Sequence, residues 1–186
     1  PFNSWDRQPF ITKVKDGVTP QLEKAFDEIR NNFIMGNYYS QEGIDNDDGS
    51  SYYNTHHNFF VYARAGMKND FGGHDNYHHS NVYAYHSRGA GINGALRTHQ
   101  DRFYLNKVIL TNSNGYIKYD CKCNTTSSCP DLHANEIYTY DGTMLDICGQ
   151  DLKERQNLGY DIGTTVSKWP SDEQIIYWGR SLLGLF

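Results

Sequence analysis

The chain has 186 residues, a net charge of −5 and a hydrophobic content of 38%, and its mean hydropathy is −0.74. This length suits one domain with a core, and the acidic balance argues against nucleic acid or an anionic membrane as the main partner. No run approaches the roughly 18 apolar residues of a membrane span, and no amino-terminal signal segment is visible. Because the chain begins at Pro1 and not at Met, we expect a processed product or a piece of a longer protein.

Residues 1–31 are predicted to form an extended or helical cap. Thr19-Pro20 matches a helix start with proline at the first helical position. Apolar residues follow at spacings of four, three and four: Leu22, Phe26, Ile29 and Phe33. Such a helix would cover the open end of the domain that follows. The alternative is an extended wrap along that domain.

The middle of the chain is repetitive. Residues 43–62 and 66–85 align without a gap, 23 residues apart, and Asn58 falls on Asn81. A period of about 20 to 30 residues with short alternating strands and Gly/Asn corners predicts an all-β solenoid. Equivalent positions on successive coils of a solenoid lie about 4.8 Å apart, so recurring polar residues form rows.

The asparagine of the repeat recurs outside this pair. Asn32 precedes it, Asn106 follows it, and Asn135 lies beyond a polar insertion. We therefore expect four or five coils over residues 32–140. Asparagine suits such a corner because its side chain bonds the backbone and tolerates left-handed conformations, and stacked amides can bond each other along the axis.

Two motifs lie between these corners: D-x-D-D-G at residues 45–49 and K-N-D-x-G-G-H-D at residues 68–75. With the asparagine corners, they resemble right-handed parallel β-helix proteins of the pectate-lyase-like superfamily. The resemblance is best from Asn32 to about Leu110 and extends to Tyr140. It implies a right-handed parallel β-helix and a polysaccharide substrate or ligand. The same coils serve lyases, hydrolases, epimerases, adhesins and surface fibres, so the resemblance leaves the activity open.

The repeat register places Asp45 beside Lys68 and Asp47 beside Asp70. Two adjacent carboxylates repel each other unless a cation or the lysine neutralises them. Oxygen-rich clusters favour a hard ion, so calcium is the expected cofactor, with Asp45, Asp47 and Asp70 as its ligands. The alternative is that these side chains only bond the corners and solvate the face.

The candidate catalytic residues belong to the same row: Lys68, His74, Asp70 and Asp47. The resemblance to β-helix lyases that act on uronic-acid polysaccharides implies a Lys or Arg as general base, which here is Lys68. Its acidic neighbours keep it protonated, which favours an ion pair instead. His74 precedes Asp75, whose carboxylate can orient one ring nitrogen and leave the other free for proton transfer.

A sugar-binding surface needs aromatic rings beside amides and charged groups, and this chain has 15 tyrosines. The residues predicted to bind substrate are Asp45, Asn46, Asn69, Asp75, Tyr52, Tyr53 and Arg88. His56 and His79 recur in register and are predicted to stack. They form an exposed polar ladder or, together with His57 and His78, a transition-metal site.

The insertion at residues 119–131 is rich in cysteine. With Cys148, its cysteines Cys121, Cys123 and Cys129 make an even number, which predicts two disulfides of unreadable pairing. A zinc site that adds His133 to the insertion's cysteines is the alternative. Asn124 begins a glycosylation sequon in the same loop, which favours a secreted, extracellular protein.

The periodicity fades after residue 140. We expect irregular structure with one degenerate coil from residue 141 to residue 170. Ser171 begins a capping box with Gln174, and the apolar residues that follow predict an amphipathic helix that ends near Gly184 and covers the second end.

Three functions fit these observations. The first is a lyase or glycoside hydrolase that acts on acidic polysaccharide. The second is a non-catalytic glycan-binding or adhesive module, and the third is a structural module of a larger extracellular assembly. In the third case the partners are further coils of a longer chain or neighbouring subunits.

Overall fold

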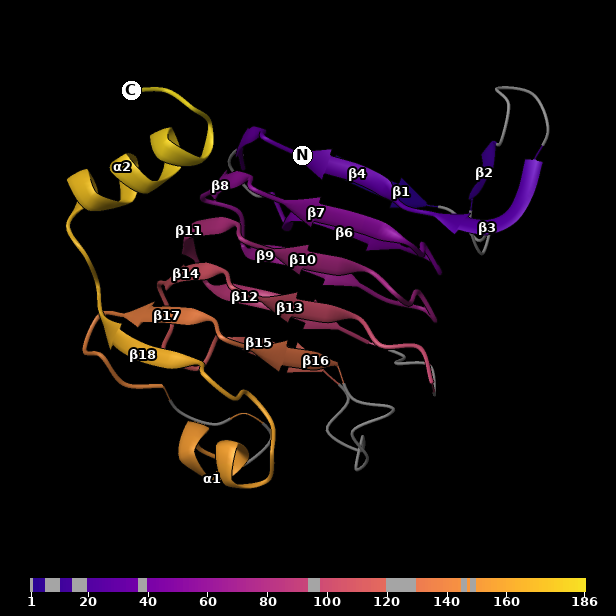
Figure 1. The fold of residues 1–186 in the computed structure, drawn as a ribbon. Coiled ribbons are helices and arrows are strands. Elements are labelled where there is room, and N and C mark those ends of the chain that lie inside the picture. The colour runs from indigo at the N-terminus through magenta and orange to yellow at the C-terminus, as the bar shows by residue number, and fades with distance from the viewer. Residues whose placement is uncertain are drawn as a thin grey trace.

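The structure, a computed structural model, describes residues 2–5, 11–14, 20–36, 40–93, 98–119, 130–144, 147 and 150–186. These residues fold into a parallel β-solenoid of about five turns, whose strands form three sheets (Figure 1). The prediction of an all-β parallel solenoid with four or five coils is confirmed.

Each of the five turns contributes one strand to each sheet, β18 adds a sixth strand to the third sheet, and all pairs within the three sheets are parallel. The first sheet comprises β1 (Phe2–Trp5), β6 (Glu42–Asp47), β9 (Ala65–Asn69), β12 (Arg88–Ile92) and β15 (Ile117–Tyr119). The second comprises β4 (Asp27–Arg30), β7 (Tyr53–His56), β10 (Tyr77–His79), β13 (Arg102–Tyr104) and β16 (Asp131–His133). The third comprises β5 (Phe33–Met35), β8 (Phe59–Val61), β11 (Val82–His86), β14 (Lys107–Leu110), β17 (Glu136–Thr139) and β18 (Thr165–Lys168). A separate antiparallel pair is formed by β2 (Ile11–Val14) and β3 (Pro20–Ala25).

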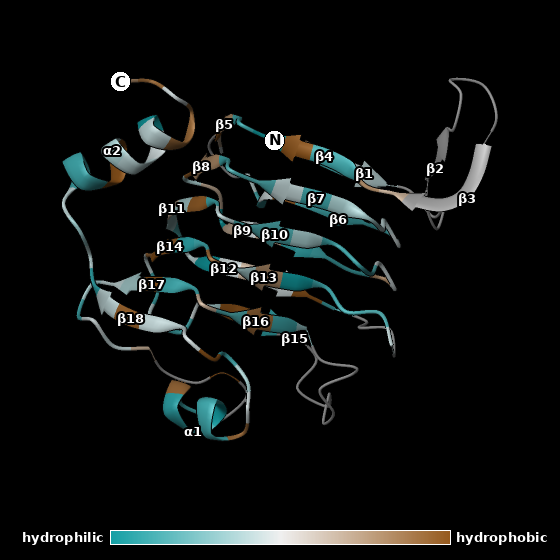
Figure 2. Cartoon of the chain, in the orientation of Figure 1, coloured by the Kyte–Doolittle hydropathy of each residue, from teal (hydrophilic) through white to brown (hydrophobic). Residues whose placement is uncertain are grey.

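The pairing register matches the sequence repeat. Ile44 lies opposite Met67, and His56 lies opposite His79, at the 23-residue offset of the two aligned segments. The coil predicted around Asn135 is present and contributes β16 and β17. In β13 and β16 a hydrophobic residue lies between two hydrophilic ones (Figure 2), because successive side chains point into and out of the solenoid.

A ladder of asparagines, buried except at its first member, joins the turns at the corner between the second and third sheets. Its members are Asn32, Asn58, Asn81, Asn106 and Asn135. The Oδ1 atom of each of the last four accepts the backbone N–H of the preceding member at 3.0 Å. It also accepts that member's Nδ2 at 3.0 to 3.2 Å. The Oγ1 atom of Thr164 ends the ladder by accepting the N–H of Asn135 at 3.2 Å.

The left-handed residue of this corner is the one before each ladder asparagine. These residues are Asn31, His57, Ser80, Leu105 and Ala134, with φ between 51° and 56°. Most of these residue types do not adopt the left-handed conformation readily. For them this conformation costs about 1 kcal/mol or more per residue. The asparagine therefore stabilises the corner through its hydrogen bonds, whereas its neighbour supplies the bend.

The repeated glycines of the first sheet allow successive turns to approach closely. A Cβ atom on Gly43 would lie 2.7 Å from the carbonyl oxygen of Gly66, and one on Gly66 would lie 2.6 Å from that of Gly89. Neither glycine has a positive φ. Their lack of a side chain, rather than a special backbone conformation, is what the fold requires.

The core is the narrow interior of the solenoid. Its fully buried members include Ile44, Met67, Phe60, Tyr83, Phe103, Val108 and Ile137. Phe60 and Tyr83 stack with ring centroids 4.9 Å apart, so the aromatic side chains also follow the turn spacing. The rows of polar residues on the outside are held in place by this packing.

The helix predicted over residues 20–33 is not formed. This segment contains β3, β4 and β5 instead. Asp27 lies opposite Tyr53, so β4 adds a strand to the edge of β7. Backbone pairing with an existing sheet outweighs an apolar spacing that suits a helix. The first turn of the solenoid therefore begins before residue 32.

The helix predicted after Ser171 is confirmed as α2 (Asp172–Leu182), and the Oγ atom of Ser171 accepts the N–H of Gln174 at 3.2 Å. It does not cover an end of the solenoid. Ile175 is buried with residues of the third sheet, so α2 lies along the outer face of that sheet (Figure 1).

A second helix, α1 (Leu152–Asn157), lies in the region expected to be irregular. Its capping box, formed by Asp151 and Glu154, is readable in the sequence. Leu152 packs against the core, and Arg155 Nε donates to Asp161 Oδ2 at 2.7 Å in a buried ion pair. This segment closes the carboxyl-terminal end of the solenoid (Figure 1).

Neither helix in the described part of the chain is long and apolar enough to cross a bilayer. Cys121, Cys123, Cys129, Cys148 and the sequon residue Asn124 lie outside the described residues.

Candidate functional site

Lys68 lies on the outer face of the first sheet among three carboxylates. Its Nζ atom is 3.1 Å from Asp45 Oδ1, 3.4 Å from Asp47 Oδ1 and 3.1 Å from Asp70 Oδ2. We call these four residues the charge cluster. The register Asp45 to Lys68 is as predicted, and Asp47 and Asp70 are joined by a side-chain hydrogen bond. The lysine ammonium occupies the space in which a calcium ion would contact the same oxygens.

The acidic neighbours control the protonation of Lys68. Burial lowers its pKa, but hydrogen bonds and the charges of Asp45 and Asp70 outweigh burial and raise the pKa above the ordinary lysine value. A lysine with a raised pKa keeps its proton at neutral pH. In this arrangement Lys68 neutralises carboxylates and is poorly suited to accept a proton.

Asp47 and Asp70 have opposite pKa shifts. The hydrogen bond from Asp70 lowers the pKa of Asp47, whereas burial and the hydrogen bond to Asp47 raise the pKa of Asp70 to about 6. Two carboxyl groups in direct contact share one proton in this way. Opposite shifts of this kind also occur in acid and base pairs of enzymes.

Two exposed aromatic side chains lie next to the charge cluster. Trp5 lies opposite Asp47 in the register, and its Nε1 donates to Asp48. Phe71 directly follows Asp70 in the chain. Trp5 is 73% exposed and Phe71 is 74% exposed. Exposed rings beside carboxylates are a common feature of sugar-binding surfaces.

Four residues predicted to bind substrate are buried. Asn46 and Asn69 have no exposed surface, and Tyr52 and Tyr53 are 4% and 9% exposed. Met67 points inward, so Asn69, two residues later on the same strand, points inward as well. These four residues are therefore not available to a ligand on the surface, contrary to the expectation. Arg88 begins β12 and is partly exposed.

His74 and Asp75 lie at the next corner, before the second sheet. The Nδ1 atom of His74 is 2.8 Å from Asp75 Oδ2, and the Nδ1 atom of His99 is 2.6 Å from the same oxygen. The predicted contact of His74 with Asp75 is therefore present, and His99 joins it. Burial raises the pKa of Asp75, but the hydrogen bonds from His99 and His74 outweigh it and lower the pKa.

The outer face of the second sheet carries a row of stacked rings: His56, His79, Tyr104 and His133. Successive ring centroids lie 5.0, 4.9 and 4.8 Å apart, and the rings are within 18° of parallel. We call this row the ring ladder. The predicted stacking of His56 on His79 is confirmed, and Arg30 extends the row onto β4, opposite His56.

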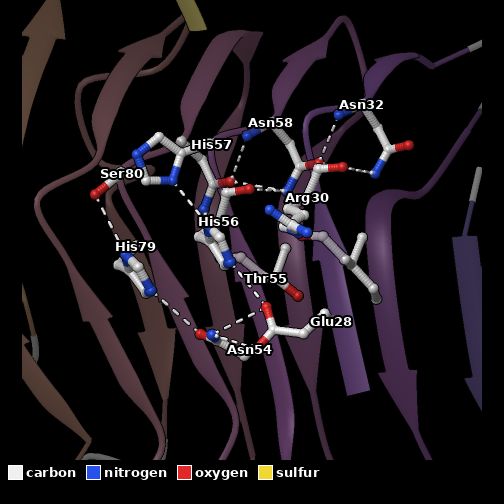
Figure 3. A network of polar contacts seen from close by, with 12 residues as sticks. Glu28, Arg30, Asn32, Asn54, Thr55, His56, His57, Asn58, His79 and Ser80 are labelled. Carbon is white, nitrogen blue, oxygen red and sulfur yellow. Dashed lines mark hydrogen bonds and ion pairs between the residues drawn. The ribbon is translucent and has the colours of Figure 1, made fainter. Parts of the chain in front are cut away.

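Polar contacts hold the first rings of the ladder in place (Figure 3). His56 Nε2 lies 2.8 Å from Glu28 Oε2, and His56 Nδ1 lies 2.7 Å from His57 Nδ1. His79 Nε2 lies 3.2 Å from Asn54 Oδ1, and Asn54 Nδ2 donates to Glu28 Oε1 at 3.0 Å. Burial and the neighbouring His56 lower the pKa of both His57 and His79.

A second, polar row runs beside the ring ladder on the same face. Its members are Glu28, Asn54, Tyr77, Arg102 and Asp131. The guanidinium of Arg102 lies over the ring of Tyr77, 4.9 Å from its centroid, and Arg102 Nε is 3.7 Å from Asp131 Oδ2. We call this row the polar row.

The two rows define what this face offers to a ligand. Stacked rings cover each other's faces and present their edges, so the ring ladder displays imidazole nitrogens and a phenol hydroxyl. The polar row adds carboxylates, an amide and a guanidinium. A ligand that lies along the solenoid axis meets similar hydrogen-bonding groups at each turn.

Sequence reasoning missed Tyr104, His133 and Arg30 as members of this row. A simple signal was present, because the ladder residue stands two positions before each ladder asparagine in every turn. His99 also escaped notice, although aligning Arg102 with Tyr77 places His99 on His74.

No protein-family model, curated protein or solved structure matches this chain. The class of the protein is therefore given by its fold, a parallel β-solenoid with polar rows on its outer faces.

Proposed function

We propose that this chain is an extracellular β-solenoid of the pectate-lyase-like superfamily that binds an extended acidic polysaccharide without cleaving it. The ring ladder and the polar row on the outer face of the second sheet are the binding surface. The observation that carries the proposal is the unbroken stacking from His56 through Tyr104 to His133.

A repeating surface is complementary to a repeating polymer. From Arg30 to His133 the ladder spans four strand steps, or about 19 Å at a strand spacing of about 4.8 Å. An extended glycan on this face makes one set of hydrogen bonds per turn. Each contact is weak, and the affinity comes from their number, as in other multivalent contacts.

Charge favours an acidic glycan on this face. Arg30 and Arg102 are permanent cations. The two acidic groups of the polar row are engaged, because Glu28 contacts His56 at 2.8 Å and Asp131 contacts His133 at 2.9 Å. Arginine suits carboxylate and sulfate groups because its donors are arranged as a planar fork.

Calorimetric titration with uronate polymers, sulfated glycans and a neutral glucan tests the proposal. We expect Tyr104→Ala and Arg102→Ala to weaken binding of the acidic polymers by about 10-fold, the loss of one good contact. Matched controls are Tyr140→Ala and Lys118→Ala, whose exposed side chains lie away from the second sheet. If Tyr104→Ala and Arg102→Ala bind the acidic polymers as tightly as the two control variants do, the proposal is contradicted, and it is also contradicted if the chain binds none of the polymers.

Cleavage of the same polymers is the second candidate function, and the opposite pKa shifts of Asp47 and Asp70 favour it. Against it, these carboxyl groups are hydrogen-bonded to each other, whereas glycosidase pairs lie about 5 Å or more apart. Turnover of uronate polymers, measured with and without calcium, distinguishes the two functions. Product formation that Asp70→Asn, Lys68→Ala and His74→Ala abolish would establish the enzyme.

A further inference from the structure

Three side chains with metal-binding atoms converge at the corner between the first and second sheets. They are His74, Asp75 and His99, and their ligand atoms all lie within 4.8 Å of one another. The two Nδ1 atoms lie 2.8 and 2.6 Å from a single oxygen, Asp75 Oδ2. Both imidazoles are thus directed at the same point.

The solenoid register produces this convergence. Tyr77 lies opposite Arg102, and the backbone N–H of Asn76 donates to Asp101 Oδ1 on the next turn at 2.9 Å. His74 and His99 stand three residues before Tyr77 and Arg102, so they occupy equivalent positions on successive turns. Their ring centroids are 4.6 Å apart, which is one turn spacing.

The surroundings fix His74 from two sides. Its backbone N–H donates to Ser51 Oγ at 3.3 Å, on the preceding turn. The ring of Tyr52 contacts its ring edge-on, with centroids 5.4 Å apart and planes at 85°. A ligand held in this way loses little conformational entropy when it binds an ion.

We propose that His74, Asp75 and His99 form a binding site for a divalent transition-metal ion such as Zn²⁺. Two imidazole nitrogens and one carboxylate oxygen are a donor set that zinc and similar ions accept, whereas calcium and magnesium prefer oxygen alone. Three protein ligands leave one tetrahedral position open to water or to a ligand group. The site links two adjacent turns of the solenoid.

The required rearrangement is small. Ligand bonds of about 2.0 to 2.1 Å in a tetrahedral site separate the donor atoms by roughly 3.3 Å. The Nδ1 to Oδ2 distances must therefore open by about half an ångström as the ion replaces the shared hydrogen bonds. The side chains of His74, Asp75 and His99 are 14%, 19% and 34% exposed, so an ion can enter while the site stays partly shielded.

The site is independent of the proposed glycan binding. It lies at a corner before the second sheet, and none of its residues belongs to the ring ladder or the polar row. If the chain binds glycan but not zinc, only the metal-site proposal fails. If it binds zinc but not glycan, only the glycan-binding proposal fails.

Calorimetric titration of the metal-free chain, without any affinity tag, with ZnCl₂ tests the site. We expect one ion per chain, and a loss of affinity of at least about 10-fold in His99→Ala and Asp75→Asn. His57→Ala is the matched control, because His57 and His56 form another imidazole pair with Nδ1 atoms 2.7 Å apart. Circular dichroism verifies that each variant is folded.

Two further readouts keep the test decisive. Zinc is expected to raise the melting temperature of the wild-type chain and of His57→Ala, but not that of His99→Ala. Bound Co²⁺ is expected to give a visible absorption band that Asp75→Asn removes. Unchanged zinc affinity in folded His99→Ala and Asp75→Asn, or a loss confined to His57→Ala, would overturn the proposal.

Discussion

The Nδ2 atom of Asn58 donates a hydrogen bond to the Oδ1 atom of Asn81 on the next turn, at 3.1 Å, and both residues are fully buried. The same Asn81 oxygen accepts the backbone N–H of Asn58, and Asn81 Nδ2 donates to the carbonyl oxygen of Thr55 at 3.0 Å. One side chain thus satisfies two backbone groups of the preceding turn, the N–H of Asn58 at the corner and the carbonyl of Thr55 in β7. Buried polar groups of this kind are costly when a partner is lost.

Asn81→Ala is therefore expected to destabilise the fold by about 2 to 4 kcal/mol, because it leaves several buried donors and acceptors without partners. Asn32→Ala is the matched control at the exposed end of the ladder, with an expected loss of about 1 kcal/mol or less. The measurement is the free energy of unfolding in urea. Equal losses at the two positions would show that the inner part of the ladder has no special role.

His78 makes the stability of the fold depend on pH. It is fully buried, and burial and the neighbouring His79 lower its pKa to about 3. Below the ordinary pKa of 6.5 the unfolded chain binds a proton at His78, whereas the folded chain does not. The free energy of unfolding is therefore highest at neutral pH and decreases as the pH falls below about 6.5. Neither ring nitrogen has a hydrogen-bond partner among the described residues.

His78→Leu removes this proton-binding group. The variant is expected to gain about 2 kcal/mol relative to wild type when the pH is lowered from 7.5 to 5.0, at 1.36 kcal/mol per pH unit below about 6.5. Urea unfolding at both pH values provides the comparison. Phe103→Leu, at the equivalent inward position of the next turn, is the control, and its loss should be the same at both pH values. A similar pH response in both variants would exclude His78 as the cause.

Lys68→Met tests the charge cluster. Without the ammonium, three carboxylates within 3.4 Å of its position lose their counterion, and we expect destabilisation by about 2 to 3 kcal/mol at pH 7. The loss should shrink as the pH falls, because the carboxyl pKa values rise in the variant and protonation then relieves the repulsion. Melting temperatures at pH 4.5 and 7 measure this, with Lys68→Arg, which keeps the charge, as the control.

Calcium distinguishes a structural lysine from a vacant ion site. Because Lys68 Nζ occupies the space between the carboxylates, added calcium should raise the melting temperature of Lys68→Met by several degrees and leave the wild type nearly unchanged. An equal increase in both chains would mean that the ion binds elsewhere or alongside the lysine.

Several features of the fold were readable because identical residues repeat in register. Asn58 and Asn81, Asp45 and Lys68, and His56 and His79 all lie opposite each other as their alignment predicts. In a solenoid, residues that are one repeat apart in the sequence lie next to each other in space, so the strand pairing follows from the repeat length.

The direction of each polar side chain was harder to predict. Asn46 and Asn69 look like surface residues by composition, yet both are buried. The alternation of side chains along the strand gives their direction, because Met67 and Asn69 lie on one face of the strand and Lys68 lies on the other. The site at His74 was incomplete for a different reason. His99 lies after a turn of different length, and only the full register from Tyr77 to Arg102 reveals its equivalence.

The packing of α2 against the third sheet depends on Gly179. A Cβ atom at this position would lie 2.3 Å from Cδ1 of the Phe59 ring, so Gly179→Ala must displace the helix or the ring. Alanine is more favourable than glycine in a helix by about 1 kcal/mol, but overpacking costs about 1 to 3 kcal/mol, and we expect a net loss of stability.

In the double variant Gly179→Ala with Phe59→Leu, the two effects should not add, because the smaller side chain makes room for the new methyl group. Unfolding free energies of the four chains give this coupling, and Ile176→Ala, on the exposed side of α2, is the control. Strict additivity would mean that α2 is held mainly by other contacts, such as Ile175 with the sheet.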